Sequence, residues 1–91
     1  MYFVYVLFSD KDRQLYVGYT NNLKRRLGEH QSGKSIATRN RLPVKLIYFE
    51  GYIKWSDAKR REKYLKGGNG RGQLKIQIGD ILKVLGYKHL I

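Results

Sequence analysis

The sequence predicts a small α/β domain in which helices pack on a three-stranded antiparallel or mixed sheet, in the order β-β-α-β-α-α. Three observations support this prediction. The chain has 91 residues, which is enough for one hydrophobic core. Two short apolar segments separated by a polar turn open the chain, and later segments repeat apolar residues with a helical period. We therefore expect one domain over residues 1–91.

The predicted strands are short and rich in apolar residues. Residues 2–8 are almost all aromatic or aliphatic, which is typical of a strand buried on both faces. The polar segment 9–13 follows, and residues 14–20 return as a second strand, so the short connection predicts an antiparallel hairpin. Residues 44–52 are rich in β-branched and aromatic residues and are expected to form the third strand.

The first predicted helix spans residues 21–32. Asn21 or Asn22 can cap its first turn, and Gly33 is typical of the residue that ends a helix. Residues 34–43 carry several cations and end at the single proline of the chain, so a basic loop is expected there.

Two more helices are expected in the C-terminal half. The second helix runs from a Ser56 cap to about residue 66. Residues 67–72 contain four glycines, which disfavour a helix interior, and are expected to interrupt the helices. Gly79 weakens the last helix. That helix is predicted from apolar residues at helical spacing, namely Leu74, Ile78, Ile81, Leu82 and Leu85.

Composition limits the possible functions. Lys and Arg number 19 against 7 Asp and Glu, a net charge of +12, so a polyanion such as nucleic acid is the expected partner. The absence of cysteine excludes a disulfide scaffold, a thiol nucleophile and a zinc finger. No apolar run approaches the roughly 20 residues of a membrane span. The N-terminus lacks the features of a signal peptide, so we expect a cytoplasmic protein without membrane contact.

Two polar residues of the first helix lie beside its apolar stripe. At about 100° per residue, Arg26 and His30 flank the direction of Leu23 and Leu27, whereas Arg25 points toward solvent. Taken alone, this placement is also explained by an arginine stem that runs along apolar surface and by a hydrogen-bonded boundary histidine.

Glu62 occupies a similar place in the second helix. It falls between Ala58 and Leu65 on the apolar side. A carboxylate there is costly unless it is paired, protonated or bound to a cation. Two explanations stay open, an ion pair with one of the many basic residues and a metal-binding or catalytic role.

The hairpin adds two tyrosines and a glycine. Tyr16 and Gly18 share one face of the second strand, and a glycine near a strand end admits close approach of another backbone or a ligand. Tyr5 lies on the first strand. Core packing with a hydroxyl at the rim is the alternative explanation for both tyrosines.

Residues 28–35 match the phosphate-binding pattern GxxxxGK[ST]. That pattern acts only when a strand precedes it and a helix opens at the Lys-Ser pair. Gly28 instead falls inside a predicted helix, and the chain is too short for a nucleotide-binding parallel sheet. No nucleotide cofactor is therefore expected.

Taken in order, these segments resemble the GIY-YIG nuclease superfamily, specifically small stand-alone members related to the catalytic domain of the excision-repair nuclease. Residues 3–5 correspond to the first tripeptide, in which only the tyrosine is retained, and residues 16–18 correspond to the second. Arg26 and His30 stand four residues apart, as in the helix of that family. Glu62 occupies the position of the metal ligand.

The resemblance implies a divalent-metal-dependent endonuclease that hydrolyses phosphodiester bonds, with DNA expected rather than RNA and a repair-type or recombination-type substrate. It implies that Glu62 holds Mg²⁺ or Mn²⁺ and that Arg26 neutralises charge on the phosphoryl oxygens. Tyr5 or Tyr16 activates water, and His30 shares in the proton transfer. Cations near these segments are expected to contact phosphates, namely Lys34, Arg39, Arg41, Lys66 and Arg71.

Two alternatives remain beside the enzyme. One is a nucleic-acid-binding module of the same fold without turnover. The other is a basic protein of ribosome or RNA assembly, which predicts tight RNA binding that is insensitive to Glu62→Ala and Arg26→Ala. Cutting that is lost in Glu62→Ala while binding survives distinguishes the enzyme from both.

Overall fold

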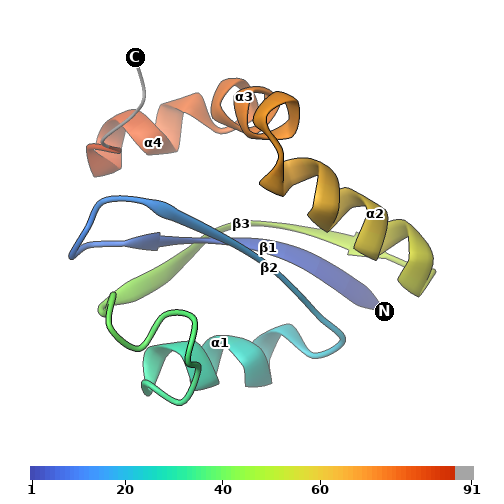
Figure 1. Cartoon of the computed structure of the whole chain (residues 1–91), viewed down its shortest axis with the longest axis horizontal. Coiled ribbons are helices and arrows are strands. Elements are labelled where there is room, and N and C mark those ends of the chain that lie inside the picture. Colours follow the sequence, from blue (N-terminus) through green and yellow to red (C-terminus); the bar gives the residue numbers. More distant parts are fainter. Residues whose placement is uncertain (88–91) are drawn as a thin grey trace.

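The computed structural model describes residues 1–87 and contains one antiparallel sheet (Figure 1). Strand β1 (Tyr2–Ser9) lies in the centre, with β2 (Leu15–Thr20) on one side and β3 (Val44–Tyr52) on the other. Strand β1 is paired on both edges and covered on both faces, and for this reason its residues are apolar without a break.

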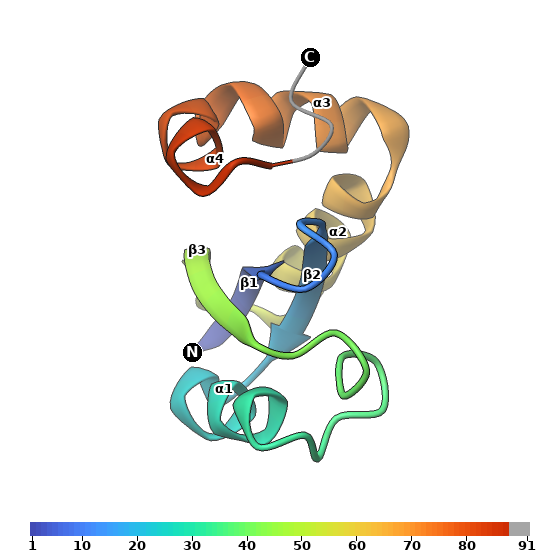
Figure 2. The ribbon, with the colours of Figure 1, turned by 90° about the vertical axis from the view of Figure 1, so that its left-hand side faces the viewer.

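Helices cover both faces of this sheet (Figures 1 and 2). Helix α1 (Leu23–Gln31) lies on one face, and α2 (Trp55–Lys66), α3 (Gly68–Gln77) and α4 (Gly79–Leu85) lie on the other. The predicted α/β class is confirmed. The even-numbered residues of β1 face the larger core beneath α2, α3 and α4, whereas two odd-numbered ones, Tyr5 and Leu7, form the core beneath α1.

The ends of α1 agree with the prediction. Asn22 caps the helix, and its side-chain oxygen accepts a hydrogen bond from the Arg25 amide at 3.1 Å. Gly33 follows the last turn with a φ of 81°, a left-handed conformation that favours glycine.

The predicted Ser56 cap of α2 is wrong. The helix begins at Trp55 after Lys54, which makes no side-chain cap hydrogen bond, and Ser56 lies inside the first turn. Only two residues separate Tyr52 from the helix, so the chain leaves β3 and enters α2 without room for a longer connection.

The predicted interruption at residues 67–72 is also wrong, because α3 begins at Gly68 and includes most of that segment. The physical reason lies at the corner between α2 and α3. A Cβ atom added at Gly70 would overlap the carbonyl oxygen of Tyr64, so the glycine allows the two helix backbones to approach closely.

The last predicted helix is divided into two. The break lies at Ile78, and Gly79 opens α4. Leu74, Ile78 and Leu82 are buried in the larger core and Leu85 packs against it, as the apolar spacing predicts, whereas Ile81 is exposed because the break at Ile78 changes the direction of the helix.

The segment that matches a phosphate-binding loop has a different geometry. Gly28 lies inside α1, and residues 34–43 form turns. None of the helices in residues 1–87 is long and apolar enough to cross a bilayer.

Candidate active site

The hairpin places two phenols side by side on the face that α1 covers. Tyr5 pairs with Gly18 across the β1–β2 ladder, and a Cβ atom at position 18 would overlap the Tyr5 ring. Gly18 therefore admits a side chain, that of Tyr5, in place of the backbone or ligand that the sequence predicts. Tyr16 lies two residues earlier on the same strand face, with its ring centroid 6.4 Å from that of Tyr5.

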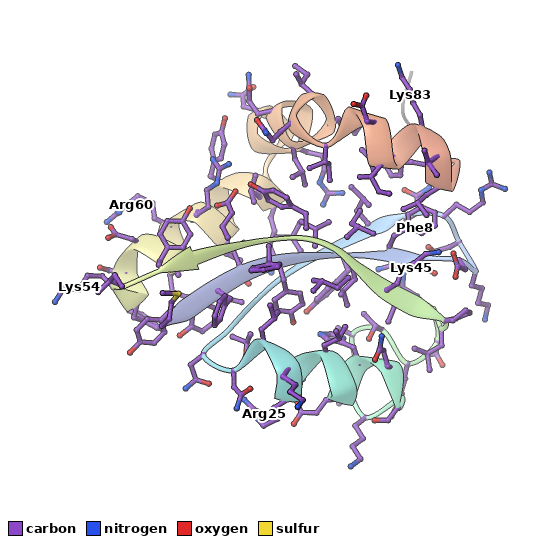
Figure 3. All side chains as sticks on the ribbon, turned by 180° about the vertical axis from the view of Figure 1, so that it is seen from behind. Phe8, Arg25, Lys45, Lys54, Arg60 and Lys83 are labelled. Atoms are coloured by element: carbon purple, nitrogen blue, oxygen red, sulfur yellow. The ribbon has the colours of Figure 1, made fainter. Side chains whose placement is uncertain are left out.

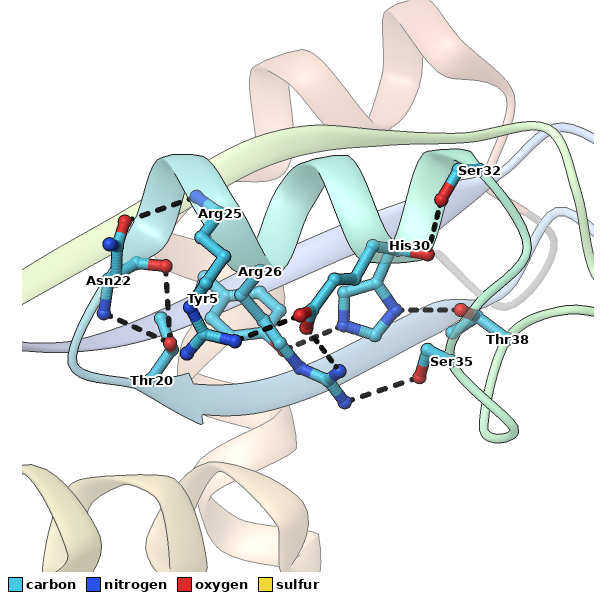
Figure 4. Close-up of polar contacts among 10 residues, drawn as sticks. Tyr5, Thr20, Asn22, Arg25, Arg26, His30, Ser32, Ser35 and Thr38 are labelled. Carbon is cyan, nitrogen blue, oxygen red and sulfur yellow. Dashed lines mark hydrogen bonds and ion pairs between the residues drawn. The ribbon is translucent and has the colours of Figure 1, made fainter.

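His30 joins these phenols from the last turn of α1 (Figure 4). Its Nε2 lies 2.7 Å from the Tyr5 hydroxyl oxygen, and its ring centroid lies 5.2 Å from that of Tyr16. The residue is 0% exposed, which is deeper than the boundary position that the helical spacing predicts.

Arg26 lies one turn earlier, at the rim of the same cluster. Its guanidinium donates to Glu29 at 3.1 Å and to the Ser35 hydroxyl at 3.2 Å (Figure 4). Arg25 also pairs with Glu29 and is about half exposed, in agreement with its predicted direction. A shallow pocket of about 350 Å³ lies beside these residues, between the end of β2 and α1.

The loop after α1 supplies two buried hydroxyl groups to the cluster. Thr38 Oγ1 lies 2.7 Å from His30 Nδ1, so both ring nitrogens have a partner, and the Ser35 hydroxyl accepts from Arg26. The sequence analysis missed Ser35 and Thr38 because neither belongs to a periodic segment. The only available signal was the presence of small hydroxyl residues in an otherwise basic loop.

The loop is itself fixed to the turn of the hairpin. Arg41 donates to the Asp12 carboxylate through both Nε and a terminal nitrogen, and the Ser9 hydroxyl donates to the Arg41 carbonyl at 2.6 Å. These contacts position the loop, and with it Thr38, against the sheet.

Burial determines the charge of the central pair. Burial, followed by the neighbouring Tyr16, raises the pKa of Tyr5 to about 12, although Arg26 acts in the opposite direction. Burial, followed by the charge of Arg26, lowers the pKa of His30 to about 4. At neutral pH the phenol therefore keeps its proton and the imidazole is uncharged.

Glu62 lies on α2, which covers the opposite face of the sheet from α1. Its side chain is 13% exposed and is paired with Lys59 at 3.0 Å and Lys66 at 3.1 Å. The ion-pair explanation therefore holds for this carboxylate. Lys59 Nζ also lies 5.0 Å from the ring centroid of Tyr19 on β2, so this side of α2 faces the β2 edge. From there the charge of Glu62 contributes, as the smallest of the causes, to the raised pKa of Tyr5.

The chemistry of this carboxylate fits one kind of metal site. Residues 1–87 contain no group of three or more His, Asp or Glu side chains that could form a cage. Mg²⁺ binds through one or two carboxylates and completes its shell with waters and substrate phosphate. Glu62 can supply one carboxylate to such an ion once Lys59 and Lys66 move away from its oxygens. The side chains of these lysines are 43% and 51% exposed, so they can move into solvent.

The five predicted phosphate-contacting cations have different surroundings. Lys34 and Arg39 are exposed on the loop beside the cluster. Arg41 is paired with Asp12, and Lys66 is paired with Glu62. Arg71 lies on α3, across the sheet from the phenols, and its Nε is buried without a hydrogen-bond partner among the described residues.

A second ionic cluster joins β3 to α2 and escaped the sequence analysis. Glu50 accepts hydrogen bonds from Tyr48, Tyr52 and two nitrogens of Arg61. Burial acts to raise the pKa of Glu50, but these donors outweigh it and lower the pKa. Because every donor belongs to β3 or α2, this cluster connects the helix to the edge strand.

The chain matches a known protein family. The profile of the GIY-YIG catalytic domain matches residues 1–75, the stretch that contains both hairpin tyrosines, Arg26, His30 and Glu62. The chain belongs to the GIY-YIG family. The resemblance inferred from the motifs is thus confirmed.

Small GIY-YIG proteins are similar to most of this chain. A UPF0213 protein of Clostridium perfringens is 46% identical over 67 residues, 72% of this chain and 71% of that protein. A UPF0213 protein of Staphylococcus haemolyticus is 38% identical over 76 residues, 82% of this chain and 92% of that protein. The solution NMR structure of a UPF0213 protein from Bacillus halodurans is 31% identical, with a TM-score of 0.56, and covers 92% of this chain and 94% of its own.

Proposed function

We propose that this GIY-YIG protein is a metal-dependent endonuclease that hydrolyses phosphodiester bonds in DNA, in the cytoplasm. The observation that supports it most is the convergence of Tyr5, Tyr16, Arg26 and His30 from three elements into one polar cluster beside exposed cations. A cluster of this kind can activate water and stabilise phosphate charge, whereas a simple binding surface requires only the cations.

Tyr5 is the proposed activator of water, since it has a proton acceptor in direct contact. As the water oxygen attacks phosphorus, its proton passes to the Tyr5 oxygen, and the Tyr5 hydroxyl proton passes to His30 Nε2 at 2.7 Å. The bond from phosphorus to the leaving oxygen breaks in the same displacement. His30 is uncharged at neutral pH, so Nε2 has a lone pair for this proton, although burial and the charge of Arg26 hold its pKa at about 4 and make it a weak base.

The cations stabilise the charge that develops on the phosphate. Arg26 presents a planar donor at the rim of the cluster, which suits the phosphoryl oxygens. Lys34 and Arg39 hold the nucleic-acid backbone without sequence choice. A divalent ion held by Glu62 supplies Lewis-acid stabilisation of the phosphate and of the leaving oxygen.

Cleavage assays test this proposal. The purified protein is incubated with branched, nicked and single-stranded DNA, and with RNA, in Mg²⁺, Mn²⁺ or chelator. We expect cutting of DNA only with metal. Tyr5→Phe and Glu62→Gln should each reduce cutting by about 100-fold or more while binding persists, because each removes a group used in the reaction. Asp57→Asn is the matched control, since Asp57 is an exposed carboxylate on the same helix.

The outcomes separate the three functions. Binding without cutting by the unaltered protein, across all substrates and metals, contradicts the nuclease and supports a binding module. Tight RNA binding that persists in Glu62→Ala and Arg26→Ala, again without cutting, supports an RNA-assembly protein.

A further inference from the structure

The buried imidazole of His30 has one oxygen partner at each nitrogen. Nε2 lies 2.7 Å from the Tyr5 hydroxyl oxygen, and Nδ1 lies 2.7 Å from Thr38 Oγ1 (Figure 4). An uncharged imidazole carries one N–H, so one nitrogen donates and the other accepts. Both partners are hydroxyl groups, which can donate or accept a hydrogen bond. Neighbouring groups must therefore determine which ring nitrogen donates and which accepts.

Arg26 supplies that direction. Its guanidinium is held at the rim of the cluster by Glu29 at 3.1 Å and by the Ser35 hydroxyl at 3.2 Å, and from there its charge acts to lower the pKa of Tyr5. A cation near a hydroxyl oxygen attracts its lone pairs and repels its hydrogen. The Tyr5 O–H therefore points away from Arg26, and His30 Nε2 is the acceptor within reach. In that arrangement Nε2 accepts and the ring proton lies on Nδ1, where it needs an acceptor, and Thr38 Oγ1 is the oxygen 2.7 Å from that nitrogen.

The position of Thr38 is built into the fold. Thr38 is 0% exposed, and its amide donates to the Ser35 carbonyl at 3.3 Å. The loop that carries it is fixed to the hairpin turn by the Arg41–Asp12 ion pair and by the Ser9 hydroxyl. The hydroxyl that faces Nδ1 is thus held by contacts to a different part of the chain from the helix that carries His30.

We propose that Thr38 is a positioning residue that holds His30 in the tautomer with its proton on Nδ1, so that Nε2 stays free to accept the proton of Tyr5. Its effect on cutting rests on the proposed nuclease function, whereas the tautomer itself does not. Thr38 touches neither the phosphate nor the water in this scheme and acts only through His30.

Nitrogen-15 NMR of the imidazole tests the tautomer at neutral pH, because protonated and unprotonated ring nitrogens have distinct chemical shifts. A His89→Gln background leaves His30 as the one histidine of the chain. We expect a protonated Nδ1 and an unprotonated Nε2. In Thr38→Val, which keeps the shape but removes the hydroxyl, a proton on Nδ1 would be buried without its acceptor, so we expect the proton to move to Nε2 and to be donated to the Tyr5 oxygen. Thr38→Ser should restore the original pattern.

Ser32→Ala is the matched control, because Ser32 also carries a hydroxyl near the end of α1 but donates it to the Glu29 carbonyl. This variant should keep the proton on Nδ1. If the protein cuts DNA, Thr38→Val should lower the cutting rate by about 10-fold to 100-fold with DNA affinity unchanged, by analogy with groups that orient a ligating histidine.

Several results overturn the inference. A protonated Nε2 in the unaltered protein overturns it directly. This measurement does not need the Thr38→Val variant, so it applies even if that variant does not fold. An unchanged tautomer in folded Thr38→Val also overturns it, as does a changed tautomer with full cutting activity. If the unaltered protein cuts no nucleic acid, the proposed function fails, while the NMR measurement still decides the tautomer.

Discussion

His30 is a residue whose burial has a measurable consequence apart from any activity. Its ring lies between the hydroxyls of Tyr5 and Thr38 and is fully excluded from solvent. Placing a charge there is unfavourable, and the neighbouring Arg26 adds repulsion. The folded protein therefore resists protonation of a group that the unfolded chain protonates readily.

This resistance predicts a loss of stability in mild acid. The unfolded chain protonates His30 near pH 6.5, whereas burial and Arg26 hold its folded pKa at about 4. The contribution of His30 to stability is thus complete above pH 6.5 and falls as the pH decreases toward 4. By pH 5 we expect a loss of about 2 kcal/mol in the free energy of unfolding. Urea unfolding between pH 5 and 7 measures it.

His30→Asn is the comparison for this measurement and should lack most of the decline. The carboxylates with lowered pKa values contribute to both proteins, and mainly below this window, namely Asp12, Glu29 and Glu50. An equally steep decline in the variant would show that another group titrates.

The corner between α2 and α3 shows how an element can form against the preference of its own residues. Glycine disfavours a helix interior by roughly 0.5–1 kcal/mol relative to alanine. Even so, α3 begins within a glycine-rich segment, because Gly70 lets its backbone meet the carbonyl of Tyr64 at the end of α2. Leu74 on the same helix is then buried against the sheet.

Two substitutions in α3 should therefore have opposite effects. Gly70→Ala is expected to destabilise the protein by about 1–3 kcal/mol, because its Cβ would overlap backbone atoms that cannot move independently. Gly72→Ala is expected to stabilise it by about 0.5–1 kcal/mol, since a Cβ there meets no atom within 4 Å. Denaturant unfolding of both variants checks this pair, and equal effects would contradict the close contact at the corner.

Positive charge at the scale of the molecule lies on several elements, including α1, α2 and α4. Figure 3 shows labelled cations on well-separated parts of the structure, with Arg25 on α1, Arg60 on α2 and Lys83 on α4. With a net charge of +12, affinity for nucleic acid should decrease steeply with salt. A cation that already forms an ion pair within the protein is less available to contact phosphate than an unpaired, exposed cation.

The salt dependence of DNA binding should separate these two kinds of cation. Lys34→Ala and Arg39→Ala should each reduce the slope of log affinity against log salt by about 0.9 on duplex DNA, because each removes an exposed phosphate contact. Arg41→Ala should leave the slope unchanged and lower stability, because Arg41 is paired with Asp12. Fluorescence anisotropy in chelator, where no cutting is expected, measures the slopes. An equal reduction in Arg41→Ala would contradict its structural role.

The sequence alone determined the features that depend on local spacing. The three strands, a cap at Asn21 or Asn22, most of the apolar side of the C-terminal helices, the place of Arg26 and His30 beside the apolar stripe and the inward side of Glu62 follow from residue types and periodicity, because strands and helices repeat at fixed intervals. The family resemblance follows from the same motifs in their order along the chain.

Only the tertiary structure decided which residues meet across the fold. The Gly70 contact and the Thr38 hydroxyl facing His30 depend on packing between separate elements. The lysines paired with Glu62, in contrast, stand three and four residues from it on the same helix. A loop without periodicity gives no local signal of its partners, and Thr38 reaches His30 because the hairpin turn holds that loop in place. The charge and the tautomer of the buried imidazole therefore follow from contacts across the fold, since burial and neighbouring groups set them.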